Sequence, residues 1–220
     1  MNFVLRVVAG IVLSASSSQA AQANYPKVAP SSPLHQLTEE YFSDDYQGDE
    51  DPLHTPDRKA RSTALVKLGW EFVKVHHENT GLRRFFLAIR MDETNASAYF
   101  GVAYVCSVKN DLDDAIIFYR EAMKYDQKFA PIYANLAKAL LLKDKNSAEA
   151  PKLLDAAINI DSRDPETYIT YSRYYADRDD WSAAAEKMNQ AIALGRQLDP
   201  GVIKDFKKHG IQLNQPPPAQ

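Results

Sequence analysis

Apolar positions recur with the period of an α-helix from residue 63 into the 190s, and the pattern repeats at a nearly fixed interval. One column consists of alanines spaced by 34, 35 and 34 residues: Ala88, Ala122, Ala157 and Ala191. A second pairs a larger residue with a small one: Leu68-Gly69, Val102-Ala103, Leu136-Ala137 and Tyr171-Ser172. Because the columns share one phase, the sequence predicts stacked helix pairs, with one extra residue in the turn near residues 143–147.

These columns have a packing explanation. Small residues at Gly69, Ala103, Ala137 and Ser172 let the two helices of a pair approach closely, and the four alanines do the same against the next pair. Larger residues such as Phe85, Tyr119, Leu154 and Met188 fill the remaining space. Cys106, the only cysteine, falls at a packing position, so we expect a buried and unreactive thiol.

Helix limits are marked locally. Asp164 before Pro165 and Asp199 before Pro200 are typical of helix starts, and Asn110 or Asp111 can cap another helix. The segment from Pro200 to about His209 ends at Gly210, a typical stop. We expect it to cover the apolar side that the last helix pair would otherwise expose.

The repeat resembles the tetratricopeptide repeat (TPR) family, which places small residues, aromatics and alanines at these columns. The resemblance covers residues 63 to about 196, and it implies an all-α, right-handed α-solenoid of about four helix-turn-helix repeats with a C-terminal capping helix. The implied boundaries are TPR 1 at 63–96, TPR 2 at 97–130, TPR 3 at 131–164, TPR 4 at 165–198 and the capping helix at 199–211. TPR 1 departs most from the pattern because Gly81 stands where alanine is usual, and Pro151 lies unusually early in a helix.

The two ends of the chain differ from the repeats. Residues 1–23 have the pattern of a signal peptide: an apolar run from Val7 to Ala15 and small residues that predict cleavage after Ala20 or Ala23. A membrane anchor is the alternative, but the run is short and interrupted at Ser14. We expect export, most readily to the periplasm and otherwise to the outside of the cell, and no membrane insertion of the mature chain.

Residues 24–62 contain five prolines and eight acidic against four basic residues, which predicts a mostly disordered acidic arm with a short helical turn around residues 37–42. Residues 212–220 predict a disordered, Pro-rich tail.

No residue pattern indicates catalysis. The net charge of −3 argues against nucleic-acid binding. His76, His77 and Glu78 are adjacent and point in different directions on a helix, so they do not predict a metal site. We expect no enzyme activity, no metal and no cofactor.

The TPR resemblance implies that the first helix of each repeat lines a concave groove. The corresponding residues are Val66, Trp70, Val73, Phe100, Tyr104, Ser107, Lys138, Leu141, Ile169 and Arg173, and the same positions include Val108 and Leu142. The basic residues with which one TPR subgroup clamps a terminal carboxylate are absent. Our hypothesis is that Trp70, Phe100 and Tyr104 anchor a helix or extended segment of a partner, with Lys138 and Arg173 at its acidic end.

The sequence therefore predicts a non-enzymatic scaffold or adaptor in the cell envelope that binds another protein, for example an envelope or secretion component. The alternative is a structural homo-oligomer that assembles through its own arm or tail.

Overall fold

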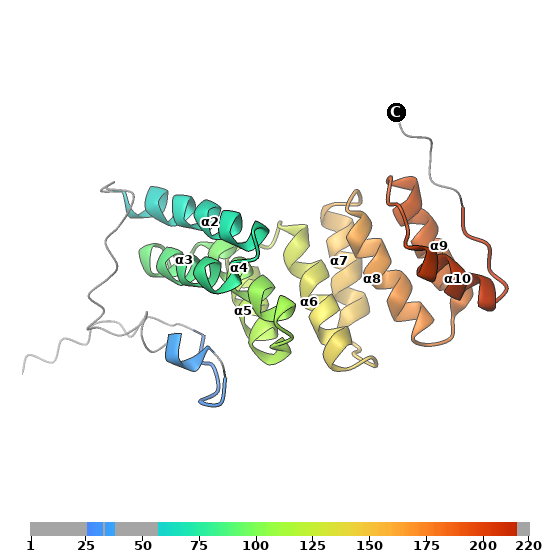
Figure 1. Ribbon diagram of the computed structural model, residues 1–220, viewed down its shortest axis with the longest axis horizontal. Helices are drawn as coiled ribbons and strands as arrows, with labels where there is room; N and C mark the ends of the chain where they lie inside the picture. The colour runs from blue at the N-terminus through green and yellow to red at the C-terminus, as the bar shows by residue number, and fades with distance from the viewer. Residues whose placement is uncertain (1–25, 33, 38–56, 215–220) are drawn as a thin grey trace, which may run out of the picture.

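The computed structural model describes residues 26–32, 34–37 and 57–214. Regular structure in residues 57–214 is entirely helical (Figure 1). The helices are α2 (Arg58–Lys74), α3 (Glu78–Met91), α4 (Ala96–Val108), α5 (Leu112–Tyr125), α6 (Ala130–Lys143), α7 (Ala150–Ile160), α8 (Pro165–Ala176), α9 (Trp181–Ala193) and α10 (Pro200–Lys208). The predicted all-α class is confirmed.

The helices pack as four successive pairs, α2/α3, α4/α5, α6/α7 and α8/α9. The second helix of each pair also contacts the first helix of the next pair, and the first helices contact one another from α2 to α4, α6 and α8. Figure 1 shows the pairs following one another in a row. This arrangement is an α-solenoid with the helix pairs that the sequence period predicts.

Two glycines make room for one buried ring where the first and second pairs meet. Phe85 on α3 is fully buried, and a β-carbon added at Gly69 on α2 would lie 2.5 Å from its ring. A β-carbon at Gly101 on α4 would lie 2.6 Å from the same ring. The Phe85 ring therefore fits between two helices only because neither presents a side chain there.

The turns between successive helix pairs contain equivalent hydrogen bonds. The carboxylates of Asp92, Asp126 and Asp161 each accept the backbone N–H two residues further on, which closes a turn directly after the second helix of the pair. The hydroxyls of Tyr133 and Tyr168 each donate to a carbonyl six residues earlier, that of Gln127 and that of Ser162. Aspartate and tyrosine columns in the sequence thus mark the junctions between pairs.

Helix starts follow the predicted signals with one exception. Asp164 accepts from the N–H groups of Glu166 and Thr167, and Asp199 accepts from Gly201. Pro151 lies in the first turn of α7, where proline is tolerated. Asp111 precedes α5 without a side-chain capping bond, and Asn110 adopts a left-handed backbone with φ of 65°.

Apolar side chains form two clusters. The larger one extends from α2 to α8 and includes Phe85, and the smaller one joins α9 to α10 around Met188 and Phe206. Ile211 and Leu213 pack on the smaller cluster, and the Asn214 N–H donates to Asn189 Oδ1 at 2.8 Å. Residues 212–214, predicted to belong to a disordered tail, therefore lie against α9.

The N-terminal part of the chain also departs from the predictions. Helix α2 begins at Arg58, inside the predicted disordered arm, and Leu34 from the same arm is only 3% exposed within the larger cluster. These contacts arise because Leu34, together with half-buried Val28 and Leu37, covers apolar surface of the repeats. Residues 35–37 are helical and overlap the predicted turn at 37–42 only at Leu37, because residues 38–42 lie outside the described residues.

The predicted signal peptide at 1–23, residues 38–56 of the arm and residues 215–220 of the tail lie outside the described residues. Within the described ones, no helix combines the length and apolar character needed to cross a membrane.

We expect Gly101→Ala to lower the free energy of unfolding by about 1–3 kcal/mol, because the added methyl group overpacks against Phe85. This loss should outweigh the gain of about 1 kcal/mol in the free energy of unfolding that alanine otherwise brings when it replaces glycine in a helix interior. Urea denaturation measures the change. The matched control is the double variant Gly101→Ala with Phe85→Leu, where the smaller side chain should reduce the loss attributable to Gly101→Ala. An equal loss in both backgrounds would contradict the clash with Phe85.

We expect Phe206→Ala to destabilise the smaller cluster by about 3–5 kcal/mol, because a buried ring that packs against Trp181 at 5.4 Å is removed. Hydrogen exchange followed by mass spectrometry should show faster exchange in α9 and α10 and unchanged exchange in α3 and α4. Uniformly faster exchange along the chain would show that the two clusters unfold as one.

Candidate functional site

The ten predicted groove residues lie on four helices that contact one another in sequence. Helix α2 carries Val66, Trp70 and Val73, α4 carries Phe100, Tyr104 and Ser107, α6 carries Lys138 and Leu141, and α8 carries Ile169 and Arg173. The surface of these four helices that remains accessible is called the first-helix face below.

Burial divides the predicted residues into three groups. Val66, Phe100 and Leu141 are buried in the larger cluster, so they support the face without forming it. Partly accessible residues are Trp70, Val73, Tyr104, Ser107 and Ile169. Lys138 and Arg173 are exposed.

The three predicted aromatic anchors lie together but are not equally accessible. The Trp70 ring lies 5.2 Å from Phe85, 5.8 Å from Phe100 and 5.1 Å from Tyr104, between ring centroids. Phe100 also packs 5.3 Å from Phe129, in the turn before α6, and is only 8% exposed. Phe100 is therefore a packing residue, which corrects its predicted role as a partner anchor, and Trp70 contributes one side of its ring to the same packing.

The accessible apolar part of the face lies near the ends of α4 and α6. Val108 is 55% exposed and Leu142 is 41% exposed, at equivalent positions of adjacent repeats. Tyr104 lies one helical turn before Val108, and Lys138 lies one turn before Leu142, so each pair shares a helix side. Val108 and Leu142 therefore occupy corresponding places on two first helices that contact each other, Val108 one turn from an aromatic ring and Leu142 one turn from an ammonium group.

Charges on the face differ in how they are compensated. Lys138 forms no ion pair within the described residues. Arg173 Nε lies 3.9 Å from Asp177 Oδ2, and Lys145 Nζ lies 3.8 Å from the other oxygen of this carboxylate. Of the two predicted cations, Lys138 is thus the one whose charge is available to a ligand.

The cysteine and the histidine beside α2 lie in environments that favour neither nucleophilic attack nor metal binding. Burial raises the pKa of the Cys106 thiol, which keeps it neutral, as its predicted packing role requires. His76 is exposed in the turn after α2, with Nδ1 3.6 Å from Glu78 Oε1. Across the described ranges, no three His, Cys, Asp or Glu side chains gather closely enough to hold a metal ion.

Several solved structures are similar to this one. MamA superposes with a TM-score of 0.52 at 17% identity, covering 68% of this chain and 81% of MamA. TTC0263, a TPR protein of Thermus thermophilus, gives 0.55 at 15% identity, with 60% and 74% covered. YrrB, "a TPR protein with an unusual peptide-binding site", gives 0.50 at 18% identity, with 67% and 78% covered.

This chain has a TPR fold. No protein-family model matches its sequence, and no curated protein matches it either. At these identities the likeness concerns the fold, and the TPR repeats of this chain must be interpreted from their own residues.

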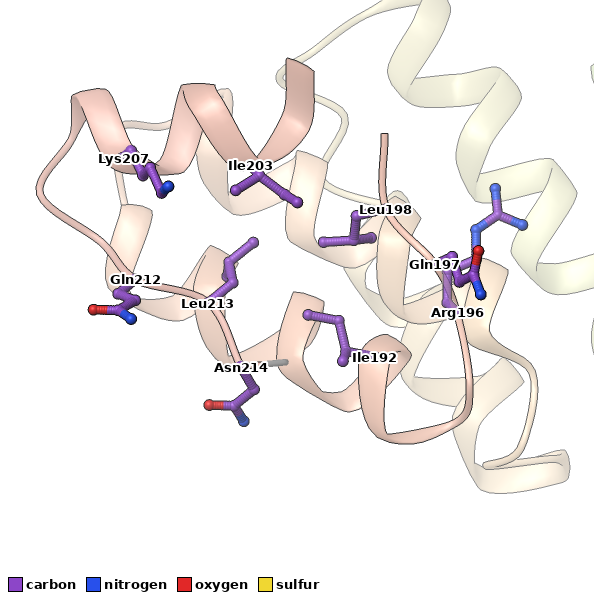
Figure 2. Close-up of a pocket in the computed structure, with 9 residues that line it drawn as sticks. All are labelled: Ile192, Arg196, Gln197, Leu198, Ile203, Lys207, Gln212, Leu213 and Asn214. Atoms are coloured by element: carbon purple, nitrogen blue, oxygen red, sulfur yellow. The ribbon is translucent and has the colours of Figure 1, made fainter. Parts of the chain in front are cut away.

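The C-terminal end of the TPR array contains a cavity of about 330 Å³ between α9, α10 and residues 212–214. Figure 2 shows Ile192, Leu198, Ile203 and Leu213 pointing toward one another across it. Lys207 and Arg196 lie at its margins, and Arg196 pairs with Glu166 at 2.8 Å. The sequence did not predict this cavity because residues 212–214, which complete it, were assigned to the tail.

Sequence reasoning also missed the place where the arm meets TPR 2. Asp114, in the first turn of α5, is only 4% exposed, and its carboxylate accepts a hydrogen bond from the Ser32 hydroxyl. A carboxylate at a helix start looks like an ordinary solvated group in sequence. Two weak signals were present, the isolated Leu34 and Leu37 among prolines, but they do not reveal which surface they cover.

Burial raises the pKa of Asp114 above its ordinary value, the Ser32 hydrogen bond partly offsets this, and Asp111 and Asp113 raise it further. A carboxyl group whose pKa is higher in the folded state contributes less to stability as pH rises through that pKa. We therefore expect Asp114→Asn to raise the melting temperature at pH 7, because asparagine accepts from Ser32 without a charge. The gain should shrink as the pH falls toward 3.8, the ordinary value of the carboxyl group.

Differential scanning calorimetry from pH 3 to pH 8 measures this dependence. Asp113→Asn is the matched control because Asp113 is exposed and pairs with Lys143. Loss of that pair should offset the relief of its repulsion with Asp114, so any gain at pH 7 should be smaller than that of Asp114→Asn. A gain for Asp114→Asn that persisted unchanged at pH 3 would show that its charge is not the cause.

Proposed function

We propose that this chain is a non-enzymatic protein-interaction scaffold that binds a segment of a partner protein on its first-helix face. The observation that carries the proposal is the pair Val108 and Leu142, two large apolar side chains exposed at equivalent positions of adjacent repeats. Single exposed apolar residues are ordinary on a protein surface. A pair that recurs with the repeat and adjoins accessible Tyr104 is what a ligand crossing the two repeats would contact.

The surroundings of this pair suggest the chemistry of the ligand. Lys138, exposed and without an ion pair among the described residues, lies one turn from Leu142 and favours a carboxylate near the apolar contact. We therefore expect a partner segment with apolar side chains on one side and an acidic residue next to them.

A terminal carboxylate bound in the manner of chaperone tails is the least expected ligand. The positions where that TPR subgroup has its last basic pair carry Glu166 and Thr170, and Glu166 already pairs with Arg196. Asn135 donates its side-chain amide to the Pro131 carbonyl at 2.9 Å, which occupies the donor that a clamp would use. The similarity to YrrB, a TPR protein with a peptide-binding site, supports peptide binding in general terms.

The place of action is part of the proposal. The signal-peptide pattern of residues 1–23 supports export and action as an adaptor in the cell envelope, with the periplasm as the compartment. The partner would then be another envelope or secretion protein.

The test is a pull-down from envelope extract in which the bound proteins are identified by mass spectrometry. We expect the double variant Val108→Ser and Leu142→Ser to lose at least tenfold of the partner that the wild-type chain captures. Both side chains are exposed, so the substitutions should leave the fold intact, which circular dichroism verifies. Trp70→Ala is a poorer probe because it also removes packing against Phe85.

Ile160→Ser is the matched control, because Ile160 is an exposed apolar residue at the end of α7. It lies beside the start of α6, at the opposite end of that helix from Leu142. Equal capture by wild type, the double variant and this control would contradict the proposal. Light scattering of the purified chain tests the alternative, since a mass of two or more chains that depended on the arm or tail would indicate a homo-oligomer.

A further inference from the structure

Residues 26–32 and 34–37 lie against TPR 2 in the way that a peptide ligand lies in a binding site. In Figure 1 this segment (blue) lies beside the helix pairs and outside their stack. Its Leu34 side chain is buried in the larger cluster, and Val28 and Leu37 pack against the same cluster. The four helix pairs contact one another directly, so the segment adds to a core that the repeats already form.

The segment holds its own conformation. The Ser32 N–H donates to the Ala29 carbonyl at 2.8 Å, and the His35 N–H donates to the Ser32 carbonyl at 3.0 Å. The Leu34 N–H donates to Ser32 Oγ at 2.9 Å. Such local bonds fix the Ser32 hydroxyl and the Leu34 side chain relative to each other, which lowers the entropy lost on binding.

Asp114 is the polar recognition group of this contact. It is almost fully buried, no lysine or arginine of the described residues pairs with it, and it accepts from the Ser32 hydroxyl. The first turn of a helix favours a carboxylate, but burying one without a cation is unfavourable unless hydrogen-bond donors satisfy its oxygens. The surface around Asp114 therefore favours a segment that brings a hydroxyl donor beside an apolar side chain.

The contact is incompletely filled. A cavity of about 270 Å³ remains between Ala29, Ser31 and Ser32 on the segment and residues 110–114 of TPR 2. Asp111, Asp113 and Asp114 line it, and Asp113 also pairs with Lys143, so Asp111 and Asp114 supply most of its uncompensated negative charge. The segment contributes only small residues to the lining. A ligand with a basic side chain in place of Ala29 or Ser31 would complement this charge better than the chain's own segment does.

We propose that the surface around Asp114 is a second peptide-binding site, occupied in this chain by its own residues 26–37, and that a partner segment with a basic residue, then a serine or threonine, then a leucine displaces them. The site lies on α5 and the turn before it, and so differs from the first-helix face. Because the internal segment belongs to the same chain, it acts at an effective concentration that is about millimolar for short connections. A partner segment must bind more tightly than the internal one to replace it.

The test uses the full chain with Leu34→Asp, which removes the internal ligand by placing a charge in its apolar contact. The probe is a fluorescently labelled peptide with the sequence of residues 26–37, followed by fluorescence anisotropy. We expect the peptide to bind Leu34→Asp at least tenfold more tightly than wild type, whose site is already occupied. Equal affinity for both proteins, or binding to neither, would overturn the proposal.

Variants of the site and the peptide assign the binding to the proposed contacts. Adding Asp114→Ala to Leu34→Asp should abolish binding. Adding Glu186→Ala, which removes an exposed carboxylate on α9 outside the site, should leave binding unchanged. A peptide with Leu34→Asp should not bind, and one with Lys27→Ala should bind unchanged because Lys27 is exposed. Binding that ignored Asp114 or Leu34 would contradict the assignment.

The preference of the site for a peptide with a basic residue is tested by the salt dependence of binding. A peptide with Ala29→Arg should bind up to about fivefold more tightly at low salt, and the gain should disappear in about 0.5 M NaCl. An unchanged or weaker affinity at low salt would overturn the predicted charge preference.

If Leu34→Asp lowers the helicity of the chain, the double variant Ser32→Ala with Leu34→Ala replaces it as the protein with an emptied site. Loss of a partner from the first-helix face would leave all these results unchanged, so the two proposals fail independently.

Discussion

The position of one buried ring governs the geometry of the N-terminal half of this TPR array. Phe85 lies between Gly69 of its own helix pair and Gly101 of the next, and a β-carbon at either glycine would meet the ring at 2.6 Å or less. The ring therefore sets how closely α2, α3 and α4 approach. Trp70 packs on one edge of it, and the Trp70–Phe100–Tyr104 contacts follow from that placement. The first-helix face is the outer surface of this arrangement.

The sequence predicts the repeat well because the repeat is determined locally. Helical periodicity, the alanine column, the small residues and the aspartates before Pro165 and Pro200 each act over a few residues, and each takes its expected place. Exposure is harder to predict. Phe100 occupies a position that faces the groove in the family pattern, yet it is buried between Trp70 on α2 and Phe129 in the turn before α6. That outcome depends on a pairing between repeats that no single column specifies.

The burial of the arm was even harder to predict from the sequence than the burial of Phe100. Its composition predicts disorder, because prolines and acidic residues outnumber apolar ones, and yet Leu34 is buried and Ser32 reaches a carboxylate 82 residues further along the chain. Such a contact depends on the three-dimensional surface that α5 and its neighbours create. Two surfaces with different requirements thus share one scaffold: an apolar, partly basic one on the first helices and an acidic, hydroxyl-binding one at the start of α5.

The boundary between the two apolar clusters does not coincide with a boundary between helix pairs. Tyr175 on α8 packs on both clusters, and its ring stacks 5.1 Å from Tyr171 at an interplanar angle of 4°. The boundary therefore runs through the fourth pair, between α8 and α9. Helix α8 belongs to the core of the repeats through Tyr171 and contacts the C-terminal cluster through Ile169 and Ala176, so it is the element that links the capping helix to the rest of the array.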